Sequence, residues 1–166
     1  IKSVLRRTRD ASLVAADVAS MRSAIAEERQ KSDGGGPDRW DLKYAPGGLI
    51  DLEFIAQHLQ LVHAAAHPDI LDTSTARVLD KAWRLGVLPA EQADVLRPAA
   101  RLYHNVTQIL RLCLPGRFDP KTAGQGIVQL LARAADLPDF ASLNADLIEM
   151  QRKVRASFAK IVSPVP

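Results

Sequence analysis

Apolar residues recur at intervals of three and four along most of this sequence, and this period constrains the fold more than any other feature. In the first such segment, which covers residues 10–31, one helical stripe consists of Leu13, Val14, Val18, Met21 and Ile25. Thr8 or Asp10 can cap the first turn of this helix, because short polar side chains accept its free N–H groups. A sequence dominated by amphipathic helices of this kind predicts an all-α fold.

Further apolar segments at helical spacing complete a bundle. They are residues 49–66, 73–86, 89–114, 121–137 and 140–162. The first of them is apolar on nearly all sides and is therefore expected to be the central helix. The second is predicted to be capped by Asp72 or Thr73 and to stop at Gly86, and the third to kink or break at Pro98. We expect one helical domain over residues 1–166, a bundle of about six helices.

Two stretches interrupt the helical pattern between residues 31 and 45. Residues 32–38, with the sequence SDGGGPD, predict a flexible glycine-rich loop, because three glycines and a proline oppose helix formation. Residues 39–44 alternate apolar and polar side chains and predict one short extended segment. A single extended segment forms no sheet alone, so the all-α prediction is unaffected.

The charges and the cysteine exclude several classes of protein. The 22 basic and 19 acidic residues are spread along the chain and leave a formal charge of +3, so we expect no nucleic-acid partner. Cys113 is the one cysteine, and no apolar run approaches the roughly 18 residues of a membrane span, so we expect a cytoplasmic protein without membrane contact. Because the chain begins with Ile1 and ends at SPVP, we expect the C-terminal piece of a longer protein.

The segment YAPGGLIDLEF places two glycines and two acids where a helix begins. Gly47 and Gly48 are expected to leave backbone N–H groups free for an anion such as a nucleotide phosphate, and Lys43 can add positive charge. Asp51 can cap the helix or contact Mg²⁺. Asp51 and Glu53 lie about 200° apart around the helix axis, so they form no close acid pair. The simpler alternative is that both acids only complement the helix dipole, and spacing alone favours it.

Two patterns with histidine offer other sites. His63 and His67 share a helix face at zinc-binding spacing, but no third ligand is obvious, so we expect no metal site and favour a helix-end role. Arg97 and His104 lie seven residues apart and resemble the Arg-x₆-His pair of helical HEPN-type ribonucleases. That resemblance implies a freestanding RNA-processing module, in which arginine holds phosphate and histidine acts as general acid or base.

A longer match involves residues 41–61, DLKYAPGGLIDLEFIAQHLQL. They resemble the signature of bacterial glutamine synthetase adenylyltransferase, a bifunctional adenylylating and deadenylylating enzyme: D-x-K-x-x-x-G-G-hydrophobic-x-D-hydrophobic-E-F-hydrophobic-x-Q. The flanking segments RDASLVAADVASMRSAIAEE and VLDKAWRLGVLPAEQADVLRPAARLYHNVTQILRL resemble the neighbouring helices of that family. The resemblance covers nearly the whole chain and weakens toward its C-terminus.

This resemblance implies the C-terminal helical domain of the adenylylating half, which follows a nucleotidyltransferase core. That core transfers AMP from ATP to a tyrosine of glutamine synthetase and so regulates nitrogen assimilation. Ile50 and Asp51 favour this half, because the deadenylylating half typically reads G-G-I-R-E-I-E-F. The chain lacks the Gly-Ser turn and the Asp-x-Asp pair that hold two magnesium ions in that superfamily. We therefore expect no catalytic residue in this fragment and no activity when it is isolated.

The resemblance also implies a site and partners. The residues expected to line the nucleotide cleft are Lys43, Gly47, Gly48, Asp51 and Glu53. ATP and Mg²⁺ serve the full-length enzyme, and the implied partners are the preceding nucleotidyltransferase domain, glutamine synthetase and the PII signal protein. We expect Asp51→Asn in the intact protein to reduce AMP transfer without unfolding the bundle. A third hypothesis is a helical domain that only docks glutamine synthetase or PII.

Overall fold

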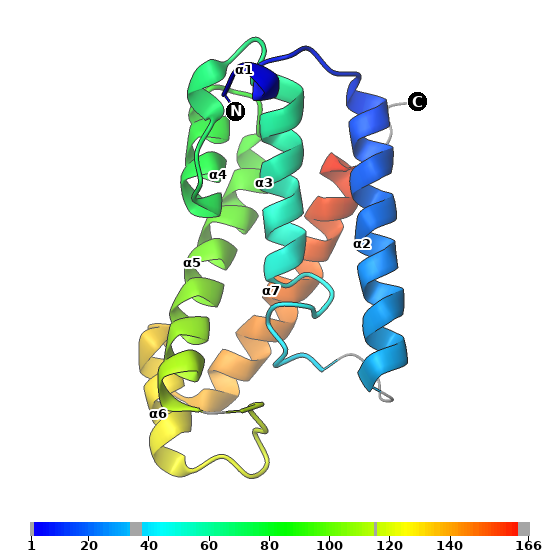
Figure 1. Ribbon diagram of the computed structural model, residues 1–166. Coiled ribbons are helices and arrows are strands. Elements are labelled where there is room, and N and C mark those ends of the chain that lie inside the picture. The colour runs from blue at the N-terminus through cyan, green and yellow to red at the C-terminus, as the bar shows by residue number, and fades with distance from the viewer. Residues whose placement is uncertain (1, 34–37, 115, 163–166) are drawn as a thin grey trace.

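The computed structural model describes residues 2–33, 38–114 and 116–162, and within these ranges all regular secondary structure is helical (Figure 1). The elements are α1 (Lys2–Leu5), α2 (Ala11–Asp33), α3 (Leu49–His63), the 3₁₀ helix η1 (Pro68–Ile70), α4 (Thr75–Arg84), α5 (Ala90–Cys113), α6 (Gln125–Ala134) and α7 (Phe140–Ile161). The predicted all-α bundle is confirmed. The described residues form seven α-helices instead of the predicted six or so, and the additional helix is the four-residue α1.

Helix α3 is the central helix of the bundle, as its apolar sequence predicted. It contacts α2 on one side and α4 and α5 on the other, while α7 packs behind it (Figure 1). Among the fully buried side chains of the core are Leu52, Ile55, Leu79, Leu96, Tyr103, Leu143 and Leu147. Four different helices contribute these residues, so the burial of apolar surface that stabilises the fold is shared across the whole bundle.

Helix α2 turns a different face to the core than its apolar stripe predicted. Leu13 and Met21 are 68% and 57% exposed, whereas Ala15 and Val18 are buried. The physical reason is that α2 lies at the edge of the bundle and packs mainly on α3, so a narrow, small-residue face suffices. Arg22 is on the buried face as well, where it meets a carboxylate of α3.

Side chains and one glycine fix several helix ends. The Asp10 carboxylate accepts two backbone N–H groups in the first turn of α2, as one of the two predicted caps. Helix α4 is capped by Ser74 rather than by Asp72 or Thr73, because the Ser74 hydroxyl accepts the N–H three residues on. Gly86 follows the end of α4 with φ +72°, which agrees with the predicted stop.

Helix α5 continues through Pro98, which was predicted to kink or break it, and is a single helix from Ala90 to Cys113. A proline inside a helix removes one hydrogen bond and costs about 3 kcal/mol. Pro98 is exposed, and the helix packs against α3, α4, α6 and α7. Tertiary packing, which supplies most helix stability in proteins, therefore outweighs the local cost.

The segment expected to be extended, residues 39–44, is instead a series of turns. The Asp38 carboxylate accepts the N–H of Trp40 at 2.9 Å, and the Asp41 carbonyl accepts the N–H groups of Tyr44 and Ala45. Aspartate side chains that accept backbone N–H groups two residues on stabilise turns, and this outweighs the alternating pattern. The expectation of an extended segment is therefore wrong.

Aromatic contacts hold this turn segment onto the lower part of the bundle. Trp40 is buried, stacks on Phe140 at 5.2 Å between ring centroids, and meets the edge of Phe118 at 4.8 Å. Trp83, by contrast, is 41% exposed. Stacked and edge-to-face aromatic pairs stabilise a fold by more than the burial of their area, so these contacts fix the turn segment on the bundle.

Two predictions concern parts of the chain that the structure covers incompletely. Helix α2 extends to Asp33, so the first two residues of the loop expected over 32–38 are helical. Residues 34–37 lie outside the described residues, and so do 163–166, which leaves the flexible loop a prediction. No helix in the described ranges is long and apolar enough to cross a membrane.

A histidine is buried in the middle of α3. The ring of His58 is nearly inaccessible, and its Nδ1 atom has no hydrogen-bond partner among the described residues. Burial lowers the pKa of His58 below its ordinary value of 6.5, and the nearby charge of His63 lowers it further. The folded protein therefore favours the neutral ring.

This burial predicts a stability that depends on pH. Because the folded pKa is below the unfolded one, the unfolded state binds more protons as the pH falls through 6.5, so stability is complete above that pH and is lost below it. Thermal unfolding at about pH 7.5 and about pH 5.5 measures the difference. We expect His58→Leu to reduce this difference in stability between the two pH values. The control His104→Gln, at an exposed position, should leave the difference unchanged. Equal pH dependence in wild type and His58→Leu would contradict this account.

Candidate functional site

The turn that leads into α3 uses its own backbone N–H groups. The N–H groups of Gly48, Leu49 and Ile50 are donated to carbonyl oxygens of the preceding turns at 2.8, 2.8 and 3.2 Å. Gly47 donates its N–H to the Asp51 carboxylate at 2.6 Å. The expectation of free N–H groups waiting for a phosphate at this helix start is therefore wrong for these four positions.

The two glycines are required by close packing rather than by an opening. Gly47 has φ +78°, and a Cβ atom added there would lie 1.9 Å from the backbone oxygen of Gln151 in α7. A Cβ on Gly48 would lie 2.4 Å from the Leu42 carbonyl oxygen. No side chain fits at either site, so both glycines let the turn lie directly against other backbone.

Asp51 is the centre of a buried ionic cluster. Its side chain is fully buried, and it pairs with the Arg22 guanidinium of α2, which is itself only 4% exposed. One Asp51 oxygen also accepts the N–H of Gly47, and Arg155 of α7 approaches it at 3.6 Å. A buried carboxylate is tolerated only when its charge and lone pairs are satisfied in this way. Asp51 thus ties α2, α3, α7 and the glycine turn together.

Tyr103 of α5 joins the same cluster from the other side. Its hydroxyl donates a hydrogen bond of 2.8 Å to the carbonyl oxygen of Gly47. Burial, and then the negative charge of Asp51, raise the pKa of Tyr103 above its ordinary value, so the hydroxyl keeps its proton and remains a donor. The glycine turn is therefore held by contacts with helices that lie far apart in the sequence.

These contacts change the interpretation of Asp51. Its oxygens face Arg22 and the Gly47 N–H, and the side chain reaches no opening. A magnesium ion would have to displace a buried guanidinium, so the geometry favours a structural role over a metal contact. For the same reason we expect Asp51→Asn to destabilise the bundle, contrary to the expectation from the sequence.

Lys43 and Glu53, the two remaining predicted site residues, are exposed and lie at one hollow. This hollow, called here the α2 hollow, has a volume of about 460 Å³ and is lined by Ile25, Glu28, Arg29, Lys43, Tyr44, Ile50, Glu53 and Phe54. It lies between α2, the turn segment and the first half of α3. The structure thus separates the five predicted residues into an open pair and a buried trio.

Two positive charges lie close to the ring of Tyr44 at the α2 hollow. The guanidinium of Arg29 lies 4.4 Å from the centre of its ring, and the ammonium of Lys43 lies 5.0 Å from it. Arg29 also pairs with Asp41 at 2.8 Å. Cations over an aromatic face are attracted by its quadrupole, so the Lys43 side chain is oriented by Tyr44 while its charge stays at the surface.

A second hollow lies on the other side of Glu53. This α5 hollow has a volume of about 560 Å³ and is lined by Leu49, Leu52, Glu53, Ser74, Thr75, Ala76, Asp80, Arg97, Ala100, Arg101, His104, Thr107, Gln108 and Arg111. Glu53 lines both hollows. The seven-residue spacing does bring Arg97 and His104 to one hollow.

Arg97 is already engaged within the α5 hollow. Its guanidinium pairs with Asp80 of α4 and lies 4.6 Å from the ring centre of Trp83. A guanidinium held by a carboxylate and an aromatic ring is less available to the phosphate of an RNA substrate. This arrangement weakens the RNA-processing interpretation, which needs Arg97 as its phosphate ligand.

Sequence reasoning missed three basic residues at these hollows. Arg29 reaches the α2 hollow only because α2 packs on α3, and no local pattern indicates that. Arg101 and Arg111 line the α5 hollow, and their spacing from Arg97 at four and fourteen residues was a readable signal of one helix face. In the described ranges no group of three or more His, Cys, Asp or Glu side chains could hold a metal ion.

Comparison with known proteins shows the family to which this chain belongs. The family model described as GlnD PII-uridylyltransferase matches residues 19–162. Bifunctional glutamine synthetase adenylyltransferase/adenylyl-removing enzymes match at 56% identity in Rhodopseudomonas palustris (strain BisB5), 57% in Bradyrhizobium diazoefficiens and 48% in Xanthobacter autotrophicus. Each match covers 98% of this chain and 16% of the relative.

These matches confirm the family resemblance of residues 41–61. The chain spans about 16% of the length of the relatives it matches, so it corresponds to one portion of those longer proteins. The chain therefore belongs to the GlnD PII-uridylyltransferase family, and it corresponds over nearly all its length to a segment of the bifunctional glutamine synthetase adenylyltransferase/adenylyl-removing enzymes.

Proposed function

We propose that this chain is the helical domain that accompanies the nucleotidyltransferase core of a glutamine synthetase adenylyltransferase. The intact protein would transfer AMP from ATP to a tyrosine of glutamine synthetase in the cytoplasm. The observation that carries this proposal is the identity of 56% and 57% along 98% of the chain to enzymes with that name. The Ile50-Asp51 pair further supports assignment to the adenylylating half.

In this proposal the helical chain helps to position the nucleotide, and the nucleotidyltransferase core carries out the reaction. The described residues offer no site suited to a magnesium ion, because the oxygens of Asp51 are engaged and no cluster of three ligands exists among them. For the transfer reaction, ATP and Mg²⁺ would be held by the nucleotidyltransferase domain. Lys43 and Glu53 would contact that domain or its nucleotide at the surface of the α2 hollow. Gly47, Gly48 and Asp51 would hold the turn and the helix that carry these two residues.

The test uses the intact adenylyltransferase and labelled AMP incorporated into glutamine synthetase. We expect Lys43→Gln and Glu53→Gln each to lower AMP transfer about tenfold, because a lost hydrogen bond to a charged group is worth about 1.5–3 kcal/mol. Both residues are exposed, so thermal stability should stay the same. Lys121→Gln and Asp146→Asn serve as matched controls, since they remove one exposed charge of each sign elsewhere.

The outcome separates this proposal from simple docking. Unchanged transfer in both site variants would overturn the role of Lys43 and Glu53. If the same variants bind glutamine synthetase or the PII protein normally and turn over normally, the chain is a docking domain only. Loss of transfer with normal binding of glutamine synthetase supports a contact with the nucleotide or its domain.

A further inference from the structure

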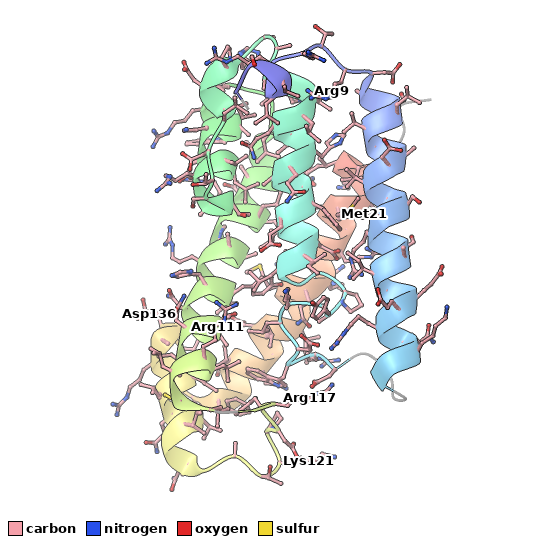
Figure 2. All side chains as sticks on the ribbon, in the orientation of Figure 1. Arg9, Met21, Arg111, Arg117, Lys121 and Asp136 are labelled. Atoms are coloured by element: carbon pink, nitrogen blue, oxygen red, sulfur yellow. The ribbon has the colours of Figure 1, made fainter. Side chains whose placement is uncertain are left out.

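Helix α5 carries a polar stripe that the proposed function does not use. The stripe consists of Arg97, Arg101, His104, Gln108 and Arg111, at successive spacings of four, three, four and three residues. Such spacings place side chains on one face of a helix. At the rise of an α-helix the stripe is about 21 Å long. Figure 2 labels Arg111 at its lower end, on the lower half of α5.

The stripe forms one wall of the α5 hollow. The opposite walls come from the first half of α3, with Glu53, and from the start of α4, with Ser74 and Thr75. In Figure 1 the start of α4 lies beside the middle of α5. The volume of about 560 Å³ is within the range of about 300–1,000 Å³ typical of small-molecule sites.

The charges in this hollow leave an excess of positive groups. Arg97 is paired with Asp80, so these two cancel. Arg101 and Arg111 are exposed, and no ion pair or hydrogen bond of their side chains is found within the described residues. Glu53 is the one other carboxylate that lines the hollow there, so two free guanidinium groups face one free carboxylate.

Two further features favour an anion. The ten-residue helix α4 begins at the hollow, and the first N–H groups and the dipole of a helix attract negative charge. Thr107, another lining residue, has a hydroxyl oxygen that is buried and without a hydrogen-bond partner in the described chain. A buried hydroxyl without a partner is uncommon in proteins.

We propose that the α5 hollow binds the phosphate groups of a small polyanion, with Arg101 and Arg111 as its principal ligands. Guanidinium groups match phosphate oxygens in charge and in bidentate geometry. Arg97 supports the site from a fixed position, because Asp80 and Trp83 hold it. A hollow of this size with two free arginines suits a compact polyphosphate better than a nucleic acid, which binds along extended basic surfaces. The inference is independent of the proposed function, because binding to this chain alone tests it.

Calorimetric titration of the purified 166-residue chain with tripolyphosphate, ATP and adenosine, without metal ions, tests the site. We expect tripolyphosphate and ATP to bind and adenosine not to bind. Affinity should fall about tenfold for Arg101→Gln and again for Arg111→Gln, as expected for the loss of charge-assisted hydrogen bonds. Equal affinity for tripolyphosphate and ATP would show that the site recognises the phosphate chain alone. Tighter binding of ATP would show that the site recognises a nucleotide.

The control is a double variant of equal net charge, Arg84→Gln with Arg133→Gln, whose positions are exposed and outside the hollow. It should bind as wild type does, and thermal unfolding should show that all variants are folded. The proposal is overturned if no polyphosphate binds, or if the Arg84→Gln with Arg133→Gln control weakens binding as much as the double variant Arg101→Gln with Arg111→Gln does. It is also overturned if an eight-nucleotide single-stranded RNA binds more tightly than tripolyphosphate.

Discussion

Gly47→Ala is expected to destabilise this protein by about 2–5 kcal/mol, which would lower Tm by about 10 °C in a domain of this size. The backbone of Gly47 has φ +78°, and a left-handed conformation costs an L-residue about 1–2 kcal/mol. The added methyl would also lie 1.9 Å from the Gln151 carbonyl oxygen, so α7 has to move. Thermal or denaturant unfolding of the purified chain measures the loss.

Gly86→Ala is the matched control for this substitution. Gly86 also has a positive φ, of +72°, but a Cβ atom added there would meet no other atom within 4 Å. Gly86→Ala should therefore lose only the stability that a left-handed backbone conformation costs an L-residue, about 1–2 kcal/mol. Equal losses at Gly47 and Gly86 would show that the close approach of α7 to the glycine turn contributes nothing.

Asp51→Asn is expected to cost about 3–5 kcal/mol, because it leaves the Arg22 guanidinium buried without its counter-charge. The amide can still accept the Gly47 N–H, so the loss reports mainly on the ion pair. Denaturant unfolding followed by circular dichroism gives the free energy of unfolding. Arg22→Met with Asp51→Leu should destabilise less than the sum of the two single changes, since neither charge is then left alone.

Glu53→Gln is the control on the same helix, two residues away. Glu53 is exposed, so its loss should change the free energy of unfolding by no more than about 0.5 kcal/mol. A loss below about 1 kcal/mol for Asp51→Asn would place Asp51 among ordinary surface acids and remove the ionic cluster from the account.

The helices were predictable because their apolar residues repeat at helical spacing over long segments. The central position of α3 followed from its apolar character on nearly all sides, and Gly86 and Asp10 marked helix ends correctly. The alternating pattern around Trp40 was misleading, because Asp38 and Asp41 bond to the backbone and form turns there. Of the two outcomes predicted at Pro98, the break does not occur, since packing of α5 overrides it.

The candidate site was only partly predictable, because its key contacts join residues far apart in the sequence. Arg22 and Asp51 are 29 residues apart, and Tyr103 is 56 residues from its partner Gly47. No local pattern indicates such pairs. Two glycines beside an acid are equally compatible with an open anion site and with a tightly packed turn, and only the position of α7 against Gly47 distinguishes the two.

Gly47 and Asp51 hold the fold, whereas Lys43 and Glu53 are the residues that we propose act at the surface. The most direct test is AMP transfer per folded molecule in the intact enzyme, comparing Asp51→Asn with Glu53→Gln at a temperature where both are folded. We predict that Asp51→Asn lowers Tm and retains transfer, and that Glu53→Gln retains Tm and lowers transfer about tenfold. Full transfer in Glu53→Gln together with abolished transfer in a folded Asp51→Asn enzyme would contradict it.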